Sequence, residues 1–194
     1  MEFSKMIEVL QQHVTDVKNL QTERLEASKD TTGGTLRGTL ARIDKAMTES
    51  FGNAETAIKQ TRKTALAGRR ERLDKMIEDS KQDYLTPDIL TGDFALLNLP
   101  IPLTVEEAQV LVDRNWNNPL FIRAAREKFR GDLYTGLNFQ NPAARALQTL
   151  EGVFDSYVNS IKNNREWLVV LLNDAERQEK IVQDAIEKFD GYVK

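Results

Sequence analysis

The side chains that could perform acid–base chemistry in this chain are one histidine and many carboxylates. His13 is the single histidine, and the sequence contains no cysteine. A serine–histidine triad needs its histidine beside the nucleophile, but His13 lies in an amphipathic segment next to Val14. We interpret it as a surface or seam residue. The lack of cysteine excludes disulfides, thiolate zinc sites and iron–sulfur clusters.

Carboxylates alone can hydrolyse glycosidic bonds when two of them face each other. Asp93, Glu106 and Glu107 lie in or beside an apolar segment and are the candidates. However, Thr104 and Glu107 also match a capping box, and acidic residues are stabilised at the start of a helix. We prefer the structural interpretation and keep a carboxylate-based hydrolase as an alternative.

Sequence patterns for a bound cofactor or metal ion are missing. The calcium-loop pattern is absent, and Gly33 and Gly34 precede Thr35 without the lysine of a phosphate-binding loop. We therefore expect a protein that is not an enzyme, with no catalytic residue, no cofactor and no metal site.

A basic stripe, residues 59–75, is the most unusual charge feature, with seven basic and two acidic residues. Such a stripe can bind the phosphates of a nucleic acid. The candidates for that contact are Lys59, Arg62, Lys63, Arg69, Arg70 and Arg72. No aromatic residue is interleaved, so stacking on single strands is not indicated. The preferred interpretation is a solvated face that acidic neighbours balance after folding.

A second cluster combines arginines with aromatic residues, a combination enriched in binding hot spots. Its members are Arg114, Trp116, Phe121, Arg123 and Arg126. They form either a contact surface or an aromatic core surrounded by arginines, and both interpretations stay open. The apolar residues 94–103 are interpreted as a strap over the core, with an exposed docking segment as the alternative.

Hydrophobic periodicity predicts two long helices in the N-terminal part. Apolar residues recur at steps of four and three over 3–28 and at near-helical spacing over 35–84, and residues 30–34 (DTTGG) separate them. Gly52 and Gly68 are weak points in the second segment. A helix with such a thin apolar stripe cannot bury the stripe by itself, so we expect the two helices to form a hairpin or to pair with another chain. The candidate partner-binding residues are Leu10, Val14, Leu40 and Met47.

The rest of the chain carries clear start and stop signals. Residues 86–103 contain three prolines and predict an extended, apolar connector. Capping residues predict helices that begin near 105, 119 and 142, with a loop at 131–140. Asn163 and Asn164 should interrupt the third helix, and a last helix should cover about 165–189. Its start, 167–172, is apolar nearly all round, which predicts deep burial or an interface.

We therefore predict an all-α fold. A coiled-coil-like hairpin arm (1–85) leads through the connector (86–103) to a helical bundle (104–194). The net charge of −3 gives no overall positive field for coating nucleic acid. The N-terminus does not resemble a signal peptide, and no apolar run approaches the roughly 20 residues of a membrane helix. We expect no membrane partner and a cytoplasmic protein, or one in a virion assembled there.

The hairpin pattern over 3–84 and the stretch LLNLPIPLTVEEAQVLVDRNW (96–116) resemble, in general character, helical virion and assembly proteins of tailed bacteriophages. The resemblance implies a coiled-coil-like arm, a compact helical end and a structural role. Phage scaffolding proteins commonly have a basic C-terminal helix, whereas 151–194 has six basic and nine acidic residues. We expect a non-catalytic protein that associates through its helices with copies of itself or with other proteins of an assembly.

Overall fold

The computed structural model describes residues 2–29, 33–80, 92–131, 134–163 and 165–193. The regular elements in these ranges are α-helices without a strand, which confirms the all-α prediction, including the long N-terminal hairpin and the C-terminal helical bundle. In chain order they are α1 (Glu2–Ala27), α2 (Gly33–Leu66), α3 (Arg69–Ser80), α4 (Gly92–Leu97), α5 (Val105–Arg114), α6 (Pro119–Lys128), α7 (Pro142–Asn163), α8 (Arg165–Asn173) and α9 (Ala175–Tyr192).

Residue contacts group the chain into two compact units. The hairpin unit comprises Met1–Ala67 and Thr149–Ala185, and the second unit comprises Gly68–Gln148 and Ile186–Lys194. This grouping differs from the arm, connector and bundle expected at 1–85, 86–103 and 104–194. The reason is that α1 has a second apolar side, which is covered by residues from the C-terminal helices.

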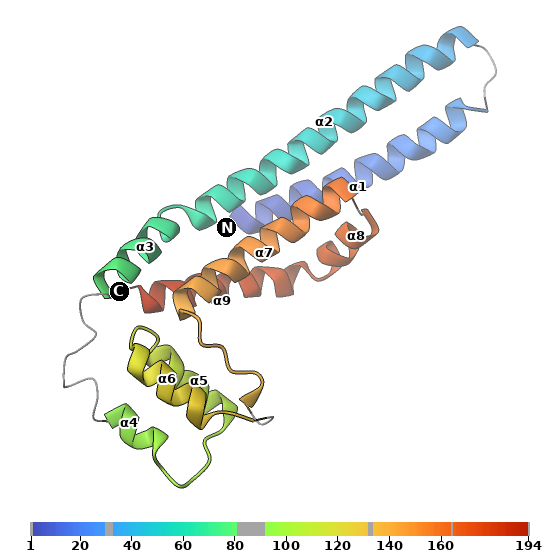
Figure 1. Ribbon diagram of the computed structural model, residues 1–194. Coiled ribbons are helices and arrows are strands. Elements are labelled where there is room, and N and C mark those ends of the chain that lie inside the picture. The colour runs from blue at the N-terminus through green and yellow to red at the C-terminus, as the bar shows by residue number, and fades with distance from the viewer. Residues whose placement is uncertain (1, 30–32, 81–91, 132–133, 164, 194) are drawn as a thin grey trace. The chain divides into compact units, whose positions relative to one another are not determined.

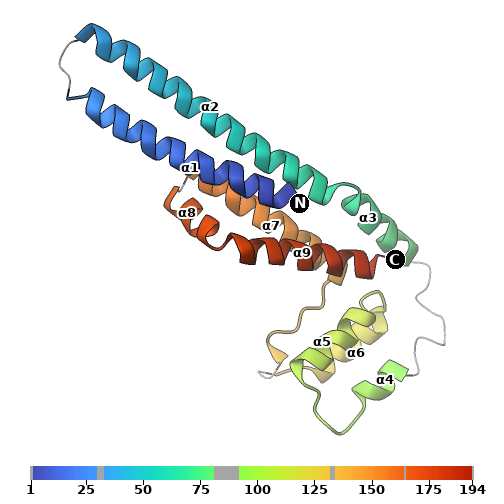
Figure 2. The same ribbon diagram turned by 180° about the vertical axis from the view of Figure 1, so that it is seen from behind.

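In the hairpin unit, α1 and α2 run antiparallel along most of their length (Figures 1 and 2). The seam between them is made by the narrow apolar stripe that the sequence predicts. The buried apolar residues of α1 are Phe3, Met6, Ile7, Leu10 and Val17, and those of α2 are Ile43, Ala54 and Ile58. His13 is a buried member of this seam, and its Nδ1 lies 2.9 Å from Ser50 Oγ of α2.

The other side of α1 is covered by the C-terminal helices. The ring of Phe3 meets Phe154 and Tyr157 of α7 edge-on, with centroids 6.3 and 6.0 Å apart. The Ser4 hydroxyl donates to Glu179 Oε1 of α9 at 2.7 Å. These contacts explain why residues 149–185 belong with the hairpin.

Two helices that the sequence predicts as continuous are broken. The expected helix over 35–84 ends at Leu66, because Gly68 has a φ of +66° that a residue with a Cβ rarely adopts. Gly52, the other weak point, lies inside α2, and residues 81–84 are outside the described ranges. The expected helix over 165–189 is also divided. Asp174 precedes α9, where its carbonyl accepts the hydrogen bond of Gln178 N, the position that aspartate favours as a cap.

The second unit confirms the predicted helix starts at 105, 119 and 142. Thr104 and Glu107 form both hydrogen bonds of a capping box at α5. The Asn118 side chain accepts from Phe121 N at 3.0 Å, and the Asn141 side chain caps α7 in the same way, accepting from the backbone N–H groups of residues 143 and 144. Each capping residue satisfies amides that the first turn leaves without a partner.

The predicted extended connector is wrong in one part, because residues 92–97 form α4. Pro100 and Pro102 follow this helix and do not interrupt it, and residues 86–91 are outside the described ranges. Leu97 of α4 is buried in the core of this unit, and the ring of Phe94 packs on Phe121 at 5.2 Å. Part of the segment therefore covers the core, as the strap interpretation requires.

The core of the second unit lies between α4, α5 and α6. Its buried residues are Leu97, Ala108, Leu111, Val112, Phe121, Ala125 and Phe129. The carboxylate of Asp113 joins this core to α7 and α9, because it accepts from Arg145, from Gln109 Nε2 at 2.6 Å and from the Tyr192 hydroxyl at 3.4 Å. Burial, together with the nearby Asp113, raises the pKa of Tyr192.

One buried hydroxyl gives a test of this packing. Tyr157 is fully buried, its hydroxyl has no hydrogen-bond partner among the described residues, and burial raises its pKa. Since an unpaired buried hydroxyl costs free energy, Tyr157→Phe should raise the free energy of unfolding by up to about 1 kcal/mol in urea titrations.

Tyr134→Phe is the matched control, because the Tyr134 hydroxyl donates to Leu103 O at 2.9 Å. This variant should lower the free energy of unfolding by about 1 kcal/mol. Equal destabilisation by the two variants would contradict the packing described for Tyr157.

Candidate interaction surfaces

The outer half of the hairpin is defined here as residues 18–27 of α1 and 36–42 of α2. None of these residues is buried, although the apolar stripe continues through Leu20, Leu36 and Leu40, which are only half-buried. Leu25 is 65% exposed. Figures 1 and 2 both show this end of the hairpin extending past α7 and α8, so no other helix in the described ranges covers α1 and α2 there.

Two ion pairs also join α1 and α2 at this end, one of them to Asp44, which lies just past the outer half. Arg24 pairs with Asp44 at 3.2 Å, and Arg42 pairs with Glu23. The side chains of both pairs are largely exposed, and exposed ion pairs contribute little to stability. The outer half is therefore the most weakly packed part of the hairpin unit.

A second apolar surface lies on α8, within 167–172. Leu168, Leu171 and Leu172 are buried, whereas Trp167 and Val170 are about half exposed and Val169 is nearly as exposed. The predicted deep burial is wrong for these three residues, and the alternative, an interface, stays a prediction. A small groove of about 140 Å³ separates α8 from α1, lined by His13, Val14, Val17, Lys18, Gln21, Leu168 and Val169.

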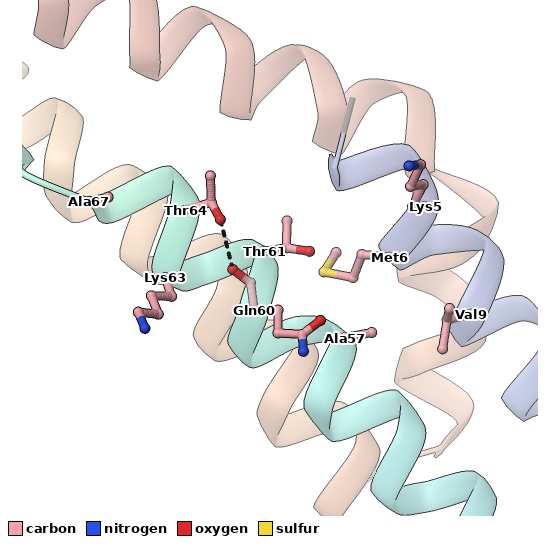
Figure 3. Close-up of a pocket in the computed structure, with 9 residues that line it drawn as sticks. All are labelled: Lys5, Met6, Val9, Ala57, Gln60, Thr61, Lys63, Thr64 and Ala67. Carbon is pink, nitrogen blue, oxygen red and sulfur yellow. Dashed lines mark hydrogen bonds between the residues drawn. The ribbon is translucent and has the colours of Figure 1, made fainter.

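A larger groove of about 640 Å³ lies between α1 and α2 near the N-terminus of α1 (Figure 3). It is lined by Lys5, Met6, Val9, Ala57, Gln60, Thr61, Lys63, Thr64 and Ala67. Among the residues that the structure describes, no carboxylate lines either groove.

The candidate partner-binding residues of the hairpin differ in exposure. Leu10 is fully buried in the seam, where it serves the fold of its own chain. Val14, Leu40 and Met47 are intermediate and keep part of their apolar surface exposed.

The basic stripe is divided between the two units at Gly68. In the hairpin unit, Lys59 pairs with Glu55 at 3.0 Å, and Arg62 pairs with Asp155 of α7 at 2.7 Å. The hydrogen bond from Lys59, with support from Lys162, holds the pKa of Glu55 below its ordinary value of 4.5. These acidic neighbours balance part of the stripe.

In the second unit, Arg69 and Arg72 both pair with Asp190 of α9 at 2.9 Å. Their guanidinium groups also lie over the ring of Phe189, at 5.9 and 5.3 Å from its centroid. Cation–π contacts of this kind stabilise a fold from within. Arg70 is exposed.

The arginine–aromatic cluster is divided between core and surface. Phe121 is fully buried, and Trp116 is half-buried. Arg114 pairs with Asp93 at 3.1 Å, and Arg126 lies 5.2 Å from the centre of the Phe139 ring. Arg123 is exposed. The structure thus places Phe121 in the core and the arginines around it.

The candidate acidic residues are used structurally. Glu107 completes the capping box, and Asp93 accepts from Arg114 and from Asn115 Nδ2 at 2.7 Å. Glu106 is exposed in the first turn of α5. Among the described residues, no group of three histidine or acidic side chains is placed to hold a metal ion.

Comparison with known proteins gives no relative: no family model, curated protein or solved structure matches this chain. Within the described ranges, no helix combines the length and the apolar character needed to cross a membrane.

The sequence led us to expect acidic neighbours around the stripe without identifying them, and it gave no sign of the large groove. The spacing of Glu55 and Lys59 could have predicted their ion pair, since residues four apart on a helix are neighbours. No sequence pattern could have predicted the pairs made by Asp155 and Asp190, because these residues lie 93 and 121 positions away from Arg62 and Arg69 in the chain.

Arg69 tests whether the stripe serves the fold. Its side chain is only 12% exposed, so Arg69→Ala would leave Asp190 with one partner fewer and remove a ring contact. We expect a loss of about 2 kcal/mol in the free energy of unfolding, measured in urea.

Lys75→Ala is the control, because Lys75 belongs to the same stripe but is exposed. Its effect should stay within about 0.5 kcal/mol. If the two variants were equally stable, the internal role of Arg69 would be refuted.

Proposed function

We propose that this protein is a non-catalytic structural component that associates with copies of itself through the outer half of its hairpin. The assembly would be of the kind from which tailed-phage particles are built, in line with the resemblance noted in the sequence. Association would bury the apolar residues that the fold of one chain leaves half-exposed.

The observation that supports this proposal is that the burial of the apolar stripe changes along the hairpin. The inner half, residues 2–17 of α1 and 43–66 of α2, is covered by α7, α8 and α9, and its stripe residues Leu10, Ile43 and Ile58 are fully buried. In the outer half the same stripe continues, yet none of its residues is buried and Leu25 is 65% exposed. Two isolated helices joined by a thin seam gain little from packing, so additional helices would stabilise this end.

A second copy is favoured as the partner because the outer half carries both signs of charge. Its basic residues are Lys18, Arg24, Arg37 and Arg42, and its acidic residues are Glu23 and Glu26. A surface with mixed charges can meet a copy of itself without strong repulsion, which a symmetric interface requires. The half-exposed apolar residues of α8 would extend the same contact.

The nucleic-acid alternative has less support, since Lys59, Arg62, Arg69 and Arg72 are paired with carboxylates within the chain. The alternative of a carboxylate-based hydrolase has even less support, because the carboxylates of Asp93 and Glu107 are held by structural hydrogen bonds. Neither alternative gains a specific observation in its favour.

The proposal is tested by light scattering on a sizing column, with absorbance read at 260 and 280 nm. The wild-type protein should elute as an oligomer without bound nucleic acid. Leu25→Glu should weaken association by about 100-fold or more, because a two-fold interface loses two buried leucines and gains two buried charges.

Ile101→Glu is the matched control, since Ile101 is 68% exposed but belongs to the second unit. Its mass should equal that of the wild-type protein. A wild-type monomer at every concentration, or equal disruption by both variants, would contradict the proposal. A protein that elutes with nucleic acid would favour the basic stripe instead.

A further inference from the structure

The large groove between α1 and α2 has a floor and walls that suit a third helix. Met6 and Thr61 form its floor, being almost fully buried where the two helices face each other (Figure 3). Ala57, Thr64 and Ala67 lie along the α2 side, and Val9 lies on the α1 side. Short side chains on the walls let the backbone of another helix approach closely, as ridge-into-groove packing requires.

The rims of the groove are positively charged. Lys5 lies on α1 and Lys63 on α2, on opposite sides of the groove in Figure 3. Both side chains are exposed, and neither has a carboxylate partner among the described residues. The other basic residues of the stripe in this unit, Lys59 and Arg62, are already paired with Glu55 and Asp155. The positive charge that remains therefore flanks the groove.

We propose that this groove is a docking site for an amphipathic helix of a partner protein, with acidic residues on both sides of its apolar edge. Small apolar residues of that helix would cover Val9 and Ala57, and its carboxylates would pair with Lys5 and Lys63. From Ala57 to Ala67 the groove follows α2 for about 15 Å, which matches about three turns of the incoming helix.

An acidic helix fits better than the other occupants. A second copy placed groove to groove would bring lysines against lysines, which is repulsive. A nucleic acid needs a longer track of cations or stacking aromatic residues, and the groove offers two lysines and an apolar floor. The site is separate from the outer half of the hairpin, so it does not depend on self-association.

The test uses the full-length protein and two fluorescently labelled synthetic helices of about 15 residues, long enough to form a helix. Both peptides carry alanine and leucine along one edge. One has glutamate on both flanks, and the other has lysine in the same positions. Fluorescence anisotropy should show that the acidic peptide binds about tenfold more tightly than the basic one, a ratio that falls as salt is added.

Two double variants with the same change in net charge assign the site. Lys5→Glu with Lys63→Glu should weaken binding of the acidic peptide by about tenfold or more. Lys29→Glu with Lys180→Glu changes two exposed lysines of the same unit outside the groove, and should leave binding within about twofold. Hydrogen exchange with the acidic peptide bound should slow in residues 57–67.

Three results would overturn the proposal. These are equal binding of the two peptides, equal effects of the two double variants, or no binding of either peptide up to about 1 mM. Displacement of the acidic peptide by a short DNA duplex would also overturn it, because the groove would then be a nucleic-acid site.

Discussion

The structure of the hairpin unit depends on one constraint, the narrowness of the apolar seam between α1 and α2. A stripe that repeats at steps of four and three covers only a small part of a helix surface, so the pairing of two such helices buries little apolar area. Along the inner half, Phe3 packs on Phe154 and Tyr157, and the C-terminal helices supply the missing cover. Along the outer half, none of the described residues from other helices supplies such a cover, and this difference is the basis of our proposal for function.

Local signals in the sequence were sufficient for the fold class and for several boundaries. The caps Thr104, Asn118 and Asn141 marked the starts of α5, α6 and α7, because a capping side chain acts within three residues of itself. Gly68 ended α2 as a weak point should, whereas Gly52 did not break it. Packing along the whole helix decides which of two glycines is tolerated, and that packing is not a local property.

Features that join distant parts of the chain were not predictable. The ion pairs of Arg62 with Asp155 and of Arg69 with Asp190 decide how much of the basic stripe is still available for a partner. The groove around Met6 and Thr61 depends on the register of α1 against α2. Hydrophobic periodicity identifies the face of each helix but not its axial position against another. Periodicity therefore led us to expect association without predicting a surface for it.

Hydrogen exchange measured at several protein concentrations tests the central claim most directly. If copies of the chain cover the outer half of the hairpin, exchange in residues 18–27 and 36–42 should slow as the concentration rises, while exchange around Leu10 and Ile58 stays constant. Exchange in the outer half that is equally fast in dilute and concentrated solution would contradict the account.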